Sequence, residues 1–445
     1  MQKGLKIVKK AKTKSVITIL GIQGGFVDKN KEVRFSNFEH KADYIFENET
    51  KEYFNTLPLL IEKYSSYEII PIFTEDAKLF NQEVLKKGYS DLKVNFNDRY
   101  FIKDDKNFED IFKIINEAIS YYDEVIVDVS HGFRHLPILM IVDLIIQNFQ
   151  NTEKISKILF AKEIKKHDKE EKGLYEIIDL KEYLDLANIS FVLTTFEKNY
   201  TVASHIESDK YKNLIEKLNS FSNDLMALNQ NNLFKKTSKD LITELDKIEN
   251  ISIKKQAYDL KQAIKKLTNY EGKKRYETYY NLAKDLYDKK YMLLSLSLLY
   301  ESMRLYAKSE IKKSHKGIVE KVEKMLNGDL YAIGDYIIKL KNKNTKWTST
   351  AKYKGKDINT LIDEKEFQLL KDSFPKKLVE KEFNDFPFSL IDKVADTRNN
   401  LAHANSDNRT FKDIQKDIGV LFDKYYNKCI KKLSIDDLKN KINIL

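Results

Sequence analysis

Short apolar runs and longer amphipathic stretches alternate over the first 180 residues. The apolar runs predict strands at Ser15–Gly21, Tyr67–Phe73, Glu124–Val129, Ile155–Ala161 and Leu174–Leu180. Between them, apolar positions at three-to-four spacing predict helices such as Tyr53–Tyr64, Phe108–Tyr122 and Leu136–Phe149. A repeated strand–helix–strand order builds a mostly parallel sheet with helices on both faces. We therefore expect an α/β domain over residues 1–185.

From about Leu180 onward, helical spacing replaces the strand pattern. Apolar residues recur at helical intervals at Leu214, Leu218, Phe221, Leu225 and Leu228, and again at Leu241, Leu245 and Ile248. We expect a helical connector over residues 186–270 and an all-α domain over residues 271–445. Residues 328–355, which include Trp347 and several Asn, Lys and Thr residues, are expected to form a long loop or insertion, to which we assign no role.

Length and charge narrow the class of protein. A chain of 445 residues exceeds one ordinary core, so two or three domains are expected. The apolar content of 42% suits folded cores. The formal net charge of +10 favours a polyanionic partner such as RNA or an oligonucleotide, although most of it comes from lysines scattered over helix faces.

Cysteine content and hydropathy indicate the cellular compartment in which the protein works. The single cysteine, Cys429, excludes an internal disulfide and a cysteine-based zinc site. The apolar run at residues 16–20 is too short for a signal sequence. The most apolar helix, Leu136–Phe149, is shorter than a membrane span and contains Asp143. We expect a cytoplasmic protein without a membrane partner.

A polar loop directly follows the predicted strand that ends at Val129. Ser130, His131, Gly132 and Arg134 offer a hydroxyl, an imidazole, close backbone approach and a guanidinium. The next helix starts near the end of this loop, and the amide groups of a helix start favour an anion. The loop therefore suits a phosphate-bearing ligand. The alternative is a polar loop without function, which α/β sheets often carry.

Two further loops follow predicted strands and belong to the same edge of the sheet. They contain Gln23 and Gly24 after the first strand and Thr74 after the second. Because ligands collect beyond the carboxyl ends of such strands, we expect the three loops to form one pocket. The glycines near Gly24 lack the full GxGxxG spacing, which disfavours a dinucleotide cofactor.

Two neighbours of the polar loop are given different roles. Asp128, at the end of the strand, is interpreted as an organiser of the loop rather than as a base. His131 and His135 alternate around Arg134, and only one of them is expected to face a ligand.

The second informative segment lies in an amphipathic helix near the C-terminus. Its apolar stripe consists of Leu390, Ile391, Val394, Ala395, Leu401 and Ala402. Arg398 falls on this stripe, where a guanidinium is costly unless it is paired or serves a site. Asn399 and His403 lie four residues apart, so they share one face of the helix.

These residue types suit metal-independent cleavage of RNA by its own 2′-hydroxyl. Such cleavage needs a proton removed from that hydroxyl and a proton delivered to the leaving 5′-oxygen, and His403 can serve either step. Arg398 can stabilise the added negative charge of the transition state. The amide of Asn399 can fix the histidine tautomer or hold a phosphate oxygen. The competing interpretation is structural: Arg398 forms a structural pair and His403 caps a surface turn, since Arg-x4-His occurs often by chance.

A buried carboxylate is expected on another helix of the C-terminal region. The helix over Tyr291–Lys308 is apolar nearly all round, and Glu301 lies on its main apolar stripe. A buried glutamate and a buried arginine on two core helices favour pairing, so we expect Glu301 to orient Arg398.

Together these motifs resemble those of a known protein class. The segment from Asp128 to Pro137, DVSHGFRHLP, resembles the signature loop of CARF (CRISPR-associated Rossmann-like) sensor domains. Arg398-Asn-x-x-x-His403 resembles the catalytic motif of HEPN ribonucleases. The order of the two motifs and the chain length resemble the ancillary ribonucleases of type III CRISPR systems, so the resemblance extends over nearly the whole chain.

The resemblance implies a fold, an activity and partners. It implies a Rossmann-like CARF domain over 1–185, a connector over 186–270 and a HEPN domain over 271–445. It also implies a homodimer in which paired sensor domains bind a cyclic oligoadenylate and paired nuclease helices form one composite site. Cleavage of single-stranded RNA would leave 2′,3′-cyclic phosphate and 5′-hydroxyl ends, without a metal. Cyclic tetra-adenylate is the favoured activator, because its four phosphates suit a symmetric pocket, and cyclic hexa-adenylate is the runner-up.

The resemblance also implies roles for individual residues. The implied catalytic residues are Arg398, Asn399 and His403. The implied contacts to the activator are Gln23, Gly24, Thr74, Ser130, His131, Gly132 and Arg134. Two rival functions stay open: a HEPN toxin ribonuclease with another trigger, and a non-catalytic CARF regulator that binds nucleic acid.

Overall fold

The computed structural model describes residues 13–36, 41–103, 106–132, 135–151, 153–166, 172–203, 206–268, 274–314, 316, 352–353, 356–357, 388–405 and 407–431. The chain divides into two compact units. Unit 1 comprises residues 1–196, 201–216 and 250–256, and unit 2 comprises residues 197–200, 217–249 and 257–445. The expected domain limits at residues 185 and 270 stay predictions.

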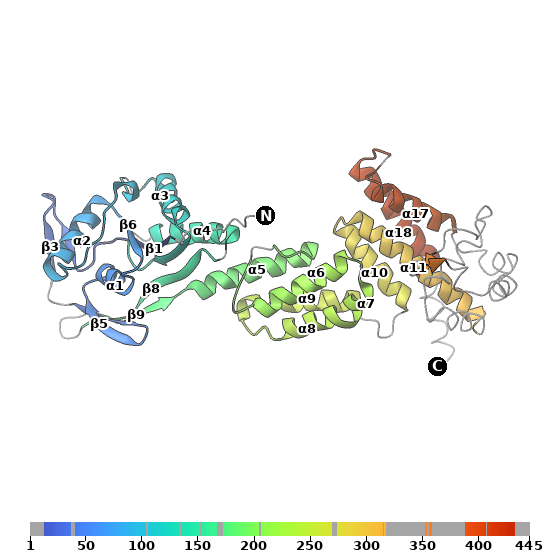
Figure 1. The fold of residues 1–445 in the computed structure, drawn as a ribbon, viewed down its shortest axis with the longest axis horizontal. Coiled ribbons are helices and arrows are strands. Elements are labelled where there is room, and N and C mark those ends of the chain that lie inside the picture. Colours follow the sequence, from blue (N-terminus) through green and yellow to red (C-terminus); the bar gives the residue numbers. More distant parts are fainter. Residues whose placement is uncertain are drawn as a thin grey trace, which may run out of the picture. The chain divides into compact units, whose positions relative to one another are not determined.

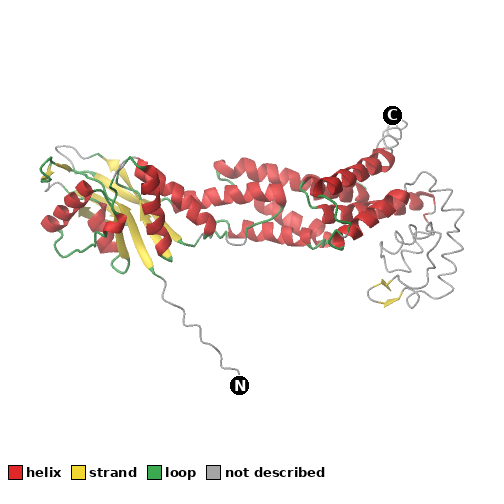
Figure 2. Cartoon of the chain, turned by 90° about the horizontal axis from the view of Figure 1, so that it is seen from above, coloured by secondary structure: helices red, strands yellow, loops and turns green. Residues whose placement is uncertain are grey.

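A mixed sheet forms the centre of unit 1 (Figure 2). Within the described residues it has seven strands in the order β5-β4-β9-β8-β7-β1-β6. The strands are β1 (Lys14–Ile19), β4 (Ala42–Phe46), β5 (Glu49–Tyr53), β6 (Glu68–Ile72), β7 (Glu124–Asp128), β8 (Ile155–Lys165) and β9 (Leu174–Asp179). The pairs β1–β6, β1–β7, β7–β8 and β4–β9 are parallel, whereas β4–β5 and β8–β9 are antiparallel. The expected mostly parallel sheet is confirmed. Its five predicted strands correspond to β1, β6, β7, β8 and β9.

Helices cover both faces of this sheet because its strands are apolar on both sides (Figure 1). On one face, Ile17 of β1 packs with residues of α3 (Phe108–Tyr121) and α4 (His135–Gln150). On the other face, Val16 packs with residues of α1 (Thr56–Lys63). Because β1 pairs in parallel with both β6 and β7, the carboxyl ends of these three strands lie at one edge of the sheet. The polar loops follow these strand ends.

Two elements near that edge are absent from the pattern-based prediction. A short hairpin joins β2 (Gly25–Val27) to β3 (Val33–Phe35). Helix α2 (Glu75–Gly88) begins after Thr74, whose side chain accepts a hydrogen bond from the backbone of Ala77. Its buried residues include Phe80 and Val84, and Phe80 contacts the ring of Phe35 in the hairpin at a centroid distance of 5.2 Å. The hairpin is thereby packed on α2.

The rest of the described chain is helical apart from two very short strands. The helices are α5 (Lys181–Asn199), α6 (Lys212–Met226), α7 (Gln230–Asn232), α8 (Ser238–Asp246), α9 (Ile251–Thr268), α10 (Arg275–Asp288), α11 (Met292–Ser314), α17 (Phe388–Ala402) and α18 (Phe411–Tyr425). The strands are β10 (Lys352–Tyr353) and β11 (Lys356–Asp357). The expectation of a helical C-terminal region is confirmed. Trp347 lies outside the described residues.

Helices α10, α11, α17 and α18 share a core within unit 2. Its central contacts are polar as well as apolar: the buried hydroxyl of Ser302 on α11 donates to the carbonyl oxygen of Tyr276 at 2.7 Å and lies 3.1 Å from the hydroxyl of Tyr425. Val394 of α17 is fully buried. This packing sets the orientation of α17, the helix that carries the second motif.

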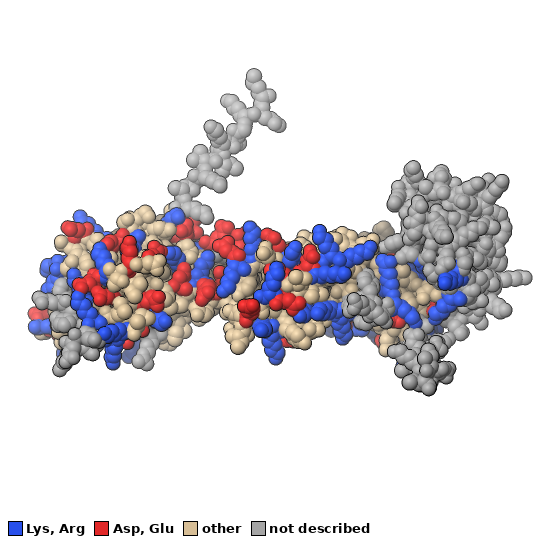
Figure 3. Space-filling model, turned by 90° about the horizontal axis from the view of Figure 1, so that it is seen from below, with Lys and Arg blue, Asp and Glu red and all other residues tan. Residues whose placement is uncertain are grey.

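Figure 3 shows Lys and Arg side chains interspersed with Asp and Glu over the face that it draws, as expected for lysines scattered over helix faces. Among the described residues, none of the helices has the length and apolar character that crossing a membrane requires.

Candidate functional sites

The loop after β7 is organised by a buried carboxylate. Asp128 is 1% exposed, and its Oδ2 accepts hydrogen bonds from the hydroxyls of Thr18 at 2.8 Å and Thr56 at 3.1 Å. Its Oδ1 accepts from the backbone N–H of Ser130 at 3.1 Å and from the Ser130 hydroxyl. Asp128 thus joins β1, the start of α1 and the loop, as expected for an organiser.

The Ser130 hydroxyl has two structural contacts. It donates to Asp128 and accepts a hydrogen bond from the backbone N–H of Ala161 on β8 at 2.8 Å. These contacts fix the loop between β7 and β8. Ser130 still lines the cavity described below, but its hydroxyl proton is already committed to Asp128.

His131 is held as a neutral imidazole beside this carboxylate. Its Nε2 accepts a long hydrogen bond of 3.4 Å from the backbone N–H of Thr56. Burial lowers the pKa of His131 below its ordinary value of 6.5, and the negative charge of Asp128 opposes that shift only in part. A neutral ring that accepts at Nε2 carries its proton at Nδ1, so His131 offers one N–H donor.

Glycine is required where the loops after β1 and β7 approach each other. Gly132 has a φ of +106°, and a Cβ there would lie 2.6 Å from Cγ2 of Ile19. A Cβ on Gly21 would lie 2.8 Å from the backbone nitrogen of Gly132. The two backbones therefore touch, which brings the first and third predicted loops together.

A cavity of about 850 Å³ opens at this edge of the sheet. It is lined by residues from the loops after β1, β6 and β7, including Gln23, Thr74, Ser130, His131 and Gly132. These five residues come from all three predicted loops, which therefore line one cavity as expected. Gly24 is outside the lining and packs against the ring of Phe54, and Arg134 lies outside the described residues.

His135 is separate from this cavity lining. It is the first residue of α4, and its ring lies 5.0 Å from the ring of Phe108 between centroids. His131 lines the cavity. The expectation that only one of the two histidines faces a ligand stays a prediction.

A buried amide network supports the cavity, and the sequence alone gives no sign of it. Asn81 of α2 donates to the carbonyl oxygen of Gly21 at 3.0 Å and accepts from the amide of Asn55 at 2.8 Å. Asn55 also caps α1 by accepting from the backbone N–H of Leu57 at 3.2 Å. The network fixes the Gly21 backbone to both helices, but its members lie in different segments and share no motif.

The rim of the cavity carries charges of both signs. Lys31, in the β2–β3 turn, forms ion pairs with Glu75 at 2.7 Å and Asp76 at 2.8 Å. Both carboxylates lie in the first turn of α2, where the helix dipole favours them. Lys31 and Lys103 are the cations of the described cavity lining. An anionic ligand would therefore meet a rim whose acidic groups are partly neutralised by Lys31.

The second motif lies at the C-terminal end of α17. Arg398, four residues after the buried Val394, is half-buried, and its Nη2 donates to Oδ1 of Asn399 at 3.1 Å. Its guanidinium carbon lies 4.9 Å from the centroid of the Tyr300 ring on α11. Asn399 and His403 are exposed and one turn apart, with the backbone N–H of His403 donating to the carbonyl oxygen of Asn399 at 2.9 Å.

The expected pairing of Glu301 with Arg398 is wrong in this structure. Glu301 forms an ion pair with Arg304 at 2.8 Å, and both side chains are largely buried. Arg304 lies three residues further along the same helix, so it reaches Glu301 without any packing between helices. Arg398 instead contacts the neighbouring aromatic residue, Tyr300.

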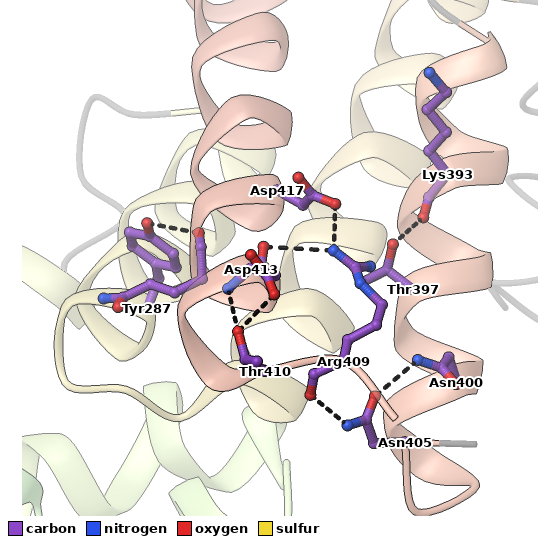
Figure 4. Close-up of polar contacts among 10 residues, drawn as sticks. Tyr287, Lys393, Thr397, Asn400, Asn405, Arg409, Thr410, Asp413 and Asp417 are labelled. Carbon is purple, nitrogen blue, oxygen red and sulfur yellow. Dashed lines mark hydrogen bonds and ion pairs between the residues drawn. The ribbon is translucent and has the colours of Figure 1, made fainter. Parts of the chain in front are cut away.

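A fixed turn follows the motif, and Figure 4 shows its contacts. The helix ends at Ala402, and Ala404 and Asn405 adopt positive φ values of 60° and 54°. Asn400 donates to the side chain of Asn405 at 3.2 Å, and Asn405 donates to the carbonyl oxygen of Arg409 at 2.8 Å (Figure 4). This turn leads into α18, and it presents His403 at its start rather than within the helix.

The described residues contain no group of three or more His, Cys, Asp or Glu side chains arranged to hold a metal ion. Neither a family model nor a curated protein matches the chain.

Proposed function

We propose that the protein is a cyclic-oligoadenylate-activated endoribonuclease that cleaves single-stranded RNA without a metal in type III CRISPR antiviral defence. The observation that carries the proposal is the setting of Arg398. Among the described residues its guanidinium has no acidic partner, and it donates a hydrogen bond to Asn399. The exposed His403 follows five residues later, at the end of the same helix. An arginine without an acidic partner and an accessible histidine at one helix end suit a site for a phosphodiester, where a second copy of the helix can bring the two side-chain types together.

In this proposal, the residues of α17 divide the chemistry of 2′-hydroxyl attack. His403 exchanges a proton with the 2′-hydroxyl or with the leaving 5′-oxygen. Arg398 donates hydrogen bonds to the nonbridging oxygens as negative charge builds on the phosphorus centre. Asn399 orients either group. The resemblance to HEPN ribonucleases supports pairing two α17 helices from a homodimer, so that one histidine acts as base and the other as acid.

The sensor half of the proposal is supported by the cavity in unit 1. Its volume of about 850 Å³ falls in the range of ligand pockets, roughly 300–1,000 Å³. Gly132 gives close backbone approach, and His131 offers a neutral N–H donor. A symmetric pair of such cavities would suit a cyclic oligoadenylate with an even number of phosphates. Cyclic tetra-adenylate is the favoured ring, and cyclic hexa-adenylate is the runner-up.

Cleavage of a fluorescent single-stranded RNA in EDTA tests the proposal. Cyclic tri-, tetra- and hexa-adenylate are each added separately to wild type and to His403→Ala. We expect cyclic tetra-adenylate to activate the wild type alone and to produce 2′,3′-cyclic phosphate ends. Wild-type cleavage without any ring would favour a toxin with another trigger. Ring binding without cleavage would favour a regulator, and equal cleavage by the variant would exclude His403 as the catalytic group.

A further inference from the structure

One aromatic ring on α11 contacts two arginines. The guanidinium carbon of Arg398 lies 4.9 Å from the centroid of the Tyr300 ring, and that of Arg304 lies 5.5 Å from it. Both distances are within the range of a cation–π interaction. Arg304 belongs to α11 itself, whereas Arg398 comes from α17. Tyr300 is therefore the point at which α11 contacts the guanidinium of the proposed active site.

The two arginines differ in how their charge is balanced. Arg304 forms an ion pair with Glu301 at 2.8 Å. The described contacts of Arg398 are the Tyr300 ring and the side-chain oxygen of Asn399, both of which are uncharged. The Glu301 carboxylate is therefore engaged with Arg304, and within the described part of the chain no carboxylate neutralises Arg398.

An aromatic partner suits a phosphate-binding arginine better than a carboxylate does. A carboxylate takes two N–H groups of the guanidinium in a bidentate pair and neutralises its charge. A ring instead attracts the cation through its face, so the N–H groups at the edge of the guanidinium plane stay available. Because an arginine side chain loses much rotamer freedom when it is fixed, a ring that holds it beforehand lowers the cost of reaching the reactive geometry.

We propose that Tyr300 is a positioning residue, which holds the Arg398 guanidinium in place for the scissile phosphate without neutralising it. The inference rests on the proposed ribonuclease function and adds a residue to it. The contact with Arg398 is made by the Tyr300 ring, so the proposed role depends on the ring and not on a proton transfer. A phenylalanine at position 300 should therefore preserve activity, whereas a leucine should not.

Steady-state cleavage of single-stranded RNA at saturating cyclic tetra-adenylate tests this role. Tyr300→Leu should lower kcat roughly 5- to 30-fold, which corresponds to about 1–2 kcal/mol at 1.36 kcal/mol per tenfold. Tyr300→Phe should stay within about twofold of wild type. The matched control is Tyr287→Leu, because Tyr287 is also half-buried in unit 2 and also has a cation, Lys284, 4.8 Å from its ring centroid. That control should keep the wild-type kcat.

A double-mutant cycle separates positioning from a general structural effect. In an Arg398→Ala background, Tyr300→Leu should cause no further loss of kcat, because the group that it positions is absent. Equal losses in both backgrounds would overturn the proposal, as would full activity of Tyr300→Leu or inactivity of Tyr300→Phe. If the wild type fails to cleave RNA, the proposed function fails. If the wild type cleaves and Tyr300→Leu cleaves at the wild-type rate, only the role of Tyr300 fails.

Discussion

Replacing Asp128 with alanine removes the centre of the sensor loop. The carboxylate accepts hydrogen bonds from the hydroxyls of Thr18, Thr56 and Ser130 and from the backbone N–H of Ser130. These groups come from three segments that meet only in the folded unit. The substitution therefore leaves four donors without their acceptor at a site where Asp128 is 1% exposed.

The expected loss of stability follows from those four hydrogen bonds. A hydrogen bond to a charged group is worth about 1.5–3 kcal/mol, and an orphaned buried donor costs about 1–3 kcal/mol. Two effects reduce the sum: the hydroxyls can rotate toward other acceptors, and the cost of burying the Asp128 charge disappears. We expect a net loss of about 2–4 kcal/mol in the free energy of unfolding of unit 1. For a unit of this size, that corresponds to a fall of roughly 5–15 °C in Tm.

The assay is urea unfolding of the full chain followed by circular dichroism, with calorimetry for Tm. The matched control is Asp123→Ala, because Asp123 also links β1 and β7 regions by accepting from the backbone N–H and hydroxyl of Thr13, each at 2.9 Å. Those contacts are exposed, so the control should lose less than about 1 kcal/mol. An Asp128→Ala protein as stable as the Asp123→Ala control would refute this account of the loop.

Three further predictions concern the cavity. Gly132→Ala should destabilise unit 1 by about 2–4 kcal/mol in urea unfolding, because residue 132 has a φ of +106° and its Cβ would clash with Ile19. An unchanged urea midpoint would contradict this close contact between Gly132 and Ile19. Since burial lowers the pKa of His131 in the folded state, its contribution to stability is present above pH 6.5 and is lost as the pH falls below that value. The drop in urea midpoint from pH 7.5 to pH 5.5 should therefore be smaller in His131→Gln than in wild type, and an equal drop would argue against a buried neutral ring. Lys31→Met should weaken the binding of cyclic tetra-adenylate about 5- to 20-fold, because it leaves two carboxylates at the rim without their cation. Calorimetry measures this affinity, and tighter binding by the variant would contradict the prediction.

The sheet could be predicted from sequence where its strands are buried on both faces. β1 and β7 are continuous apolar runs, so their position and the loop after β7 were evident from hydropathy alone. β5 has the sequence ETKEY with four exposed residues, so it carries no apolar pattern. Helix α2 did carry a signal: Thr74 followed by acidic residues is typical of a helix start.

The site could be predicted only in part, because local patterns do not show which segments meet. The role of Asp128 followed from its place at a strand end. Asn55 and Asn81 gave no signal, since their hydrogen bond depends on the packing of α1 beside α2. The helical pattern placed Glu301 and Arg398 on inward stripes, but it did not show that Arg304 would reach Glu301 first within the same helix.

We propose that a ligand in the cavity of unit 1 controls cleavage at α17. The most direct test is the RNA cleavage rate as a function of cyclic tetra-adenylate concentration, with ligand affinity measured on the same proteins. We expect Gln23→Ala to shift the curve to higher ligand concentration while the maximal rate is kept. We also expect His403→Ala to abolish cleavage while ligand affinity is unchanged. A cleavage rate that does not depend on the ligand, or that Gln23→Ala lowers equally at all ligand concentrations, would contradict this proposal.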